Sequence, residues 1–102
     1  MKKFKLKIKH DFAEALEGII GAVMQDEYRH FDDKLIVSGL AEIKEKLYKK
    51  LCHYQSEYTM SLTPVQAISL YLFVTTFSVY GINMYAMSGL QQISNAIHQQ
   101  FQ

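Results

Sequence analysis

Residues 58–66, Tyr-Thr-Met-Ser-Leu-Thr-Pro-Val-Gln, contain the signals for a strand followed directly by a helix. The first five residues alternate between apolar or aromatic and polar side chains, which is typical of a half-buried β-strand. Thr63 is a favourable N-cap, Pro64 suits the first helical position, and Gln66 completes a capping box. We therefore expect a strand over Tyr58–Leu62 and a helix that begins at Pro64.

The start of the chain follows the same plan. Residues 4–9, Phe-Lys-Leu-Lys-Ile-Lys, alternate between apolar and cationic side chains, which predicts a strand with a lysine face in water. At Asp11 the apolar spacing becomes helical, and Asp11 and Glu14 predict an N-cap and its reciprocal partner. We expect this helix to end near Tyr28.

A second helix is expected in each half of the chain. The first of them should begin with Asp33 as its N-cap and run to about Cys52. A strand over Lys34–Val37 is the alternative, because Leu35, Ile36 and Val37 form a short apolar run. In the helical interpretation, one apolar stripe faces inward and comprises Leu40, Ile43, Leu47 and Leu51.

The last helix matches the one that begins near Asp33 at an offset of 50 residues. Ser38-Gly39-Leu40 corresponds to Ser88-Gly89-Leu90, and Asn83 takes the place of Asp33 as the cap. These matches predict one domain, residues 1–102, built from a β-α-α unit that occurs twice, in 1–52 and 53–102. Similar local chemistry without duplication is the alternative.

The repeat, if present, indicates the fold. Two units related by a pseudo-twofold axis would pair their strands antiparallel, with about four helices packed against the sheet. The predicted class is therefore α+β and mainly helical. Gly39 and Gly89 are expected to let their helices pack closely, because glycine has no Cβ.

Charge is absent from the second half of the chain. Glu57 is the last charged residue, and the 45 residues from Tyr58 to Gln102 contain no Asp, Glu, Lys or Arg. Such a stretch is unusual for a solvated surface, so we expect it to lie in a core, against a partner or in a membrane. Gln66, Ser69 and the Gly81-Ile82-Asn83 break argue against a membrane span.

Self-association is the leading expectation for this uncharged half. The helix that begins at Pro64 is apolar nearly all the way round, and a chain of 102 residues has little room to bury every side of it. A twofold homodimer would cover the remainder. The candidate self-association residues are Leu70, Phe73, Phe77, Tyr80, Met84 and Met87.

Constellations that would indicate a catalytic, metal or cofactor site are weak. Glu27 and His30 have the spacing of a helical metal pair, but further carboxylates would have to come from another copy. His10, beside Asp11, is interpreted as part of a strand-to-helix junction, with no acid or thiol at a spacing that would make it a ligand site. Cys52 is expected to be half buried, and as the sole cysteine it favours the reducing cytoplasm.

The lysine strand is the one electrostatic feature that suggests a ligand. Lys3, Lys5, Lys7 and Lys9 could contact phosphates, although lysines on an edge strand also serve to prevent aggregation. The leading hypothesis is a non-enzymatic cytoplasmic interaction module that forms a homodimer through its uncharged helices. The alternative is a nucleic-acid-binding accessory protein that uses the lysine strand.

Overall fold

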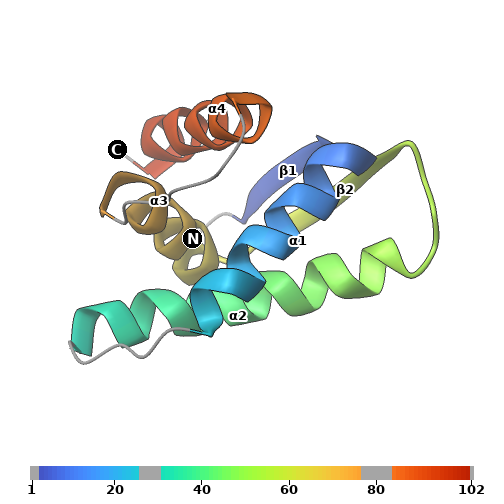
Figure 1. The fold of residues 1–102 in the computed structure, drawn as a ribbon. Coiled ribbons are helices and arrows are strands. Elements are labelled where there is room, and N and C mark those ends of the chain that lie inside the picture. Colours follow the sequence, from blue (N-terminus) through green and yellow to red (C-terminus); the bar gives the residue numbers. More distant parts are fainter. Residues whose placement is uncertain (1–2, 26–30, 77–83, 102) are drawn as a thin grey trace.

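Two antiparallel strands and four helices make up the described part of the chain in the computed structural model (Figure 1). The structure describes residues 3–25, 31–76 and 84–101. The elements in chain order are β1 (Phe4–Lys9), α1 (His10–Met24), α2 (Phe31–Leu51), β2 (Glu57–Leu62), α3 (Pro64–Thr76) and α4 (Met84–Phe101). This arrangement confirms the predicted α+β, mainly helical class.

The sheet has one apolar face and one polar face. β1 and β2 are antiparallel, with Phe4 opposite Leu62 and Lys9 opposite Glu57. The apolar residues of both strands are buried, whereas Lys5, Lys7 and Lys9 are exposed. The helices therefore cover the apolar face, and the lysine face is open, as the alternation predicts.

The predicted capping box at the start of α3 is present. The Thr63 amide donates to Gln66 Oε1 (3.1 Å), and the Gln66 amide donates to Thr63 Oγ1 (3.2 Å). Gln66 is only 3% exposed, and its Oε1 also accepts a hydrogen bond from Lys46 Nζ (2.8 Å). One side chain thus caps α3 and attaches it to α2.

The predicted capping box at Asp11 is wrong. α1 begins one residue earlier, at His10, and its N-cap Lys9 makes no side-chain capping bond. Glu14 is instead hydrogen-bonded to His10 Nε2 (2.8 Å). α1 ends at Met24. The end expected near Tyr28 lies outside the described residues.

α2 begins at Phe31, two residues before the predicted cap Asp33, and it ends at Leu51. The alternative strand over Lys34–Val37 is excluded, since these residues are helical. Leu40, Ile43 and Leu47 are fully buried, as the apolar stripe predicts, and Leu51 packs partly buried at the margin of the core. For α4, the predicted cap Asn83 lies outside the described residues.

Both paired glycines lie at close helix contacts, which confirms a packing role, but the contacts are with α3 and α1 and not between α2 and α4. A Cβ on Gly39 would lie 2.5 Å from Ser69 Cβ, and a Cβ on Gly89 would lie 2.7 Å from Phe12 Cδ2. Real Cβ atoms do not come this close to other carbon atoms. Gly39 of α2 therefore contacts α3, and Gly89 of α4 contacts α1, so each packs on the other half of the chain.

The two halves bury corresponding positions. Leu40, Ile43 and Leu47 of α2 are matched at the offset of 50 by Leu90, Ile93 and Ile97 of α4, which are also buried. The fit to a twofold axis is incomplete, because α2 packs more extensively on α3 than α4 packs on α1. Duplication of a unit stays a prediction.

One hydrophobic core joins the two strands and all four described helices. It contains buried side chains from both halves, among them Leu16 of α1, Leu40 of α2, Tyr58 of β2 and Leu70 of α3. Within residues 3–25, 31–76 and 84–101, no helix is long and apolar enough to span a membrane.

Candidate functional site

One face of α3 is apolar and exposed. Leu70 and Phe73 are fully buried on the inner side of the helix, whereas Val65 is 60% exposed, Ile68 39% and Leu72 38%. α3 carries no charged residue along its length. We call Val65, Ile68 and Leu72 the α3 row.

α2 adds an apolar residue near this face. Lys46 contacts Gln66 and Gly39 contacts Ser69, so α2 and α3 run in opposite directions along their interface. Leu35 lies one turn before Gly39 on the same side of α2 and is 60% exposed. This order places Leu35 towards the C-terminal end of α3.

The residues predicted for self-association are divided by the structure. Leu70 and Phe73 lie in the monomer's own core, so they are not accessible to a partner while the chain is folded. Met87 is 51% exposed on α4. Met84 begins α4, but its side chain, like Phe77 and Tyr80, lies outside the described residues.

Sequence reasoning missed the α3 row because α3 is apolar nearly all round. The apolar spacing of such a helix does not say which side meets the core. The inner side is set instead by contacts from distant parts of the chain, such as the hydrogen bond that Lys46 Nζ of α2 donates to Gln66 Oε1 (2.8 Å). Gln66, Ala67 and Leu70 then define the inner side, and the α3 row is left outside.

The lysine strand lies open on the sheet. Lys5, Lys7 and Lys9 are exposed on its outer face, and Lys3 is exposed just before β1. Lys7 Nζ lies 3.3 Å from a carboxylate oxygen of Glu57 on β2. We call the outward side chains Lys5, Lys7 and Lys9 the lysine face.

Further lysines border this face on the β2 side. A shallow groove there is lined by Lys46, Lys49 and Lys50 of α2 together with Thr59 and Ser61 of β2. Thr59 and Ser61 are opposite Lys7 and Lys5 in the sheet, so the groove adjoins the lysine face. The structure thereby gathers cations from two elements on one side of the molecule.

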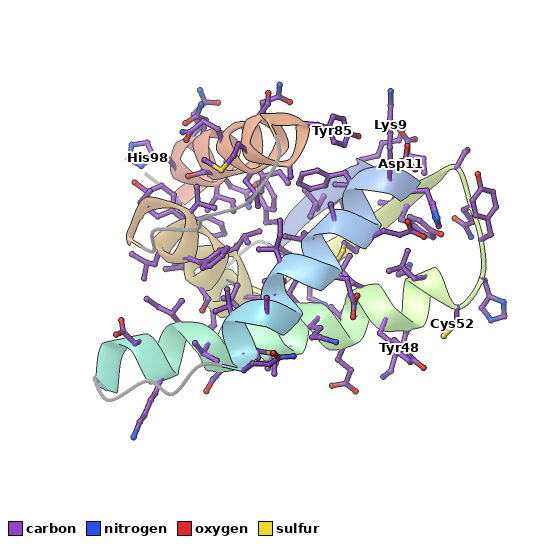
Figure 2. All side chains as sticks on the ribbon, viewed as in Figure 1. Lys9, Asp11, Tyr48, Cys52, Tyr85 and His98 are labelled. Carbon is purple, nitrogen blue, oxygen red and sulfur yellow. The ribbon has the colours of Figure 1, made fainter. Side chains whose placement is uncertain are left out.

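A second groove runs along the other side of β1. It has a volume of about 280 Å³ and lies between β1, the start of α1 and α4. Its walls include Lys9, Phe12, Tyr85, Gln92 and Ile93. Figure 2 shows Tyr85 beside the end of β1 where Lys9 lies, and we call this space the β1 groove.

His10 makes hydrogen bonds and a ring contact that its position between a strand and a helix did not predict. Its Nδ1 is hydrogen-bonded to the Tyr58 hydroxyl (2.9 Å) and its Nε2 to Glu14 (2.8 Å). The ring also packs on Tyr54, with centroids 4.6 Å apart. Glu14 stands four residues after His10, so this bond was readable from helical spacing, whereas Tyr58 is brought close only by the strand pairing.

The Tyr58 hydroxyl also accepts a hydrogen bond from the Gln55 amide (3.1 Å). The side chain of Tyr58 is 1% exposed. Both ring nitrogens of His10 are engaged, so we interpret the cluster as a structural link between α1, β2 and the turn before β2.

Cys52 is exposed, and the prediction of a half-buried thiol is wrong. α2 ends at Leu51, so Cys52 lies in the turn beyond the helix and no longer follows its apolar stripe (Figure 2). Among the described residues, no group of three His, Cys, Asp or Glu side chains is placed to hold a metal ion. The predicted pair Glu27 and His30 lies outside them.

No family model, curated protein or solved structure matches this chain. The candidate functional surfaces on the described part of the chain are the α3 row, the lysine face and the β1 groove.

Proposed function

We propose that this chain is a small, non-enzymatic, cytoplasmic interaction module that forms a homodimer through the α3 row. The observation that carries the proposal is the exposure of Val65, Ile68 and Leu72 on a helix without a charged residue. Burying such a face removes apolar area from water and desolvates no charge.

A second copy is the occupant that fits this face best. In a twofold dimer, α3 of one protomer would lie against α3 of the other, so each row would cover the other. Stable interfaces bury roughly 800 Å² on each partner, which exceeds what three side chains supply. Leu35 and the uncharged polar residues around the row would complete the contact as its rim.

The test is the molar mass in solution, measured by size-exclusion chromatography with light scattering. The unaltered chain is expected to be a dimer at concentrations of about 100 µM, and the double variant Ile68→Glu/Leu72→Glu a monomer. The circular dichroism spectrum of the double variant should match that of the unaltered chain, because both positions are exposed and glutamate favours helix.

Tyr48→Glu is the matched control, since Tyr48 is 62% exposed on α2 and away from the α3 row. This variant should remain a dimer. A monomeric unaltered chain at every concentration, or a double variant that still dimerises, would contradict the proposal. Phe73→Asp is unsuitable as a test because the buried charge would unfold the monomer itself.

Nucleic-acid binding is the second candidate, and one observation favours it. Lysines from β1 and from the end of α2 share one side of the molecule. Salt-sensitive binding of a single-stranded oligonucleotide, weakened by Lys5→Glu or Lys7→Glu, would support this function. Binding that neither substitution weakens, or no binding at low salt, would exclude nucleic-acid binding through the lysine face.

A further inference from the structure

The outer edge of β1 has no strand beside it in the described structure, because the sheet has the order β1-β2. The His10 amide donates to the Ser56 carbonyl (3.1 Å), which extends the register of the two strands by one residue pair. Bonded pairs alternate with non-bonded pairs along an antiparallel ladder. The backbone groups of Lys5, Lys7 and Lys9 therefore point away from β2.

The opposite edge of the sheet is already occupied. Lys46 Nζ of α2 donates to the Ser61 carbonyl (2.7 Å) on the outer edge of β2. On the β1 edge, Gln100 Nε2 donates to the Lys3 carbonyl (3.4 Å), just before the strand. Within the described part of the chain, no side chain bonds the outward backbone groups of β1 beyond that point.

The β1 groove supplies a floor for a strand added at this edge. Side chains alternate across a strand, so every second residue of an added strand would point towards the helices. Phe12, Tyr85 and Ile93 line the groove there, and Tyr85 is 53% exposed. Apolar side chains would fit these positions.

The lysine face selects the charge of the added strand. β2 brings one carboxylate, Glu57, to within 3.3 Å of Lys7. Like charges opposite each other destabilise a sheet, so pairing with β1 of a second copy would set lysine against lysine. Asp or Glu side chains of the added strand, on the same face of the sheet as the lysines, would form ion pairs with Lys5 and Lys9 instead.

We propose that the free edge of β1 binds an extended acidic segment of another protein by strand addition. Its backbone bonds the outward groups of Lys5, Lys7 and Lys9, its carboxylates meet the lysine face, and its apolar side chains enter the β1 groove. This mode of recognition adds main-chain bonds for affinity and side-chain positions for specificity. It uses a different surface from the α3 row and does not depend on dimerisation.

The probe is a fluorescent peptide, acetyl-Glu-Val-Glu-Ile-Glu-Val-Glu-amide, whose binding is followed by anisotropy. We expect Lys5→Glu/Lys9→Glu to weaken binding by roughly tenfold, because two attractive cross-strand pairs become repulsive. The same variant should bind the peptide with lysine in place of glutamate more tightly than the unaltered chain does. Lys49→Glu/Lys50→Glu, which changes the net charge equally, should alter binding by less than about twofold.

Two further measurements separate strand addition from simple charge attraction. Methylation of alternate peptide nitrogens, the ones that face β1, should abolish binding while leaving every charge in place. Hydrogen exchange at the amides of Lys5, Lys7 and Lys9 should slow when the unmodified peptide binds.

Equal binding of the methylated peptide would overturn the proposal. An oligonucleotide of about ten thymidines that binds the same lysines as tightly as the peptide would also overturn it, because it would identify a general polyanion surface. Cross-linking of β1 to β1 between two copies would show that the edge serves self-association and would equally refute the proposal.

Discussion

The Tyr58 hydroxyl is the point where three parts of the chain meet. It is hydrogen-bonded to His10 at the start of α1 and accepts a hydrogen bond from the amide of Gln55 in the turn before β2. Leaving a buried polar group without a partner costs more free energy than one hydrogen bond contributes. Removal of this hydroxyl would therefore affect the His10 ring and the Gln55 amide, which both bond to it.

Tyr58→Phe should lower the free energy of unfolding by about 1–2 kcal/mol, because it leaves the Gln55 amide and His10 Nδ1 without this partner. Urea unfolding followed by circular dichroism would measure the change. Tyr54→Phe is the control, since Tyr54 is 75% exposed, and it should change stability by less than about 0.5 kcal/mol. Equal stability of the two variants would show that the hydroxyl contributes nothing.

Gly39 and Gly18 predict opposite outcomes for the same substitution. Gly39→Ala would place a Cβ against Ser69 and force α2 away from α3, at a cost of roughly 1–3 kcal/mol. Gly18→Ala meets no atom within 4 Å and should stabilise α1 by about 0.5–1 kcal/mol. Thermal unfolding of both variants tests the pair, and a neutral Gly39→Ala would mean that the two helices do not depend on close approach.

At the scale of the elements, local signals were sufficient where a pattern within the segment itself specifies the element. The alternation in β1 and the Thr63–Gln66 capping box are of this kind, and both are present as predicted. The start of α1 was misplaced because one partner of His10, Tyr58, lies 48 residues away and becomes adjacent only through strand pairing.

α3 shows why the candidate surface was harder to predict than the fold. Its composition indicated burial, but a 13-residue helix that is apolar all round gives no periodic signal for its inner side. The choice of Leu70 and Phe73 as surface residues followed from that ambiguity, and both are fully buried. Packing against α2 and the sheet determines which side is left exposed, and this is information from distant parts of the chain.

For the whole molecule, each half depends on the other for its sheet and core. β1 pairs with β2, and α2 of the first half packs on α3 of the second. A single strand with two helices has no sheet partner and only part of the core.

We therefore expect the separate fragments 1–52 and 53–102 to be largely unfolded, and their mixture to recover helical structure as a one-to-one complex. Circular dichroism of the fragments and their mixture, with light scattering for the stoichiometry, provides the measurement. A fragment that folds alone would contradict this dependence. Folding of fragment 1–52 as a pair of identical copies would favour the duplicated unit.

The bond from Gln100 to the Lys3 carbonyl has a topological consequence. It brings the end of α4 beside the residue that precedes β1, so the described chain comes close to a closed ring. A ring of this kind can be opened elsewhere without separating β1 from β2, provided that a short linker joins Phe101 to Lys3. An opening between His53 and Tyr54, in the exposed turn, suits this purpose because it precedes the Gln55 amide and the Ser56 carbonyl, which bond to Tyr58 and His10, and the resulting circular permutant would keep every layer of the fold.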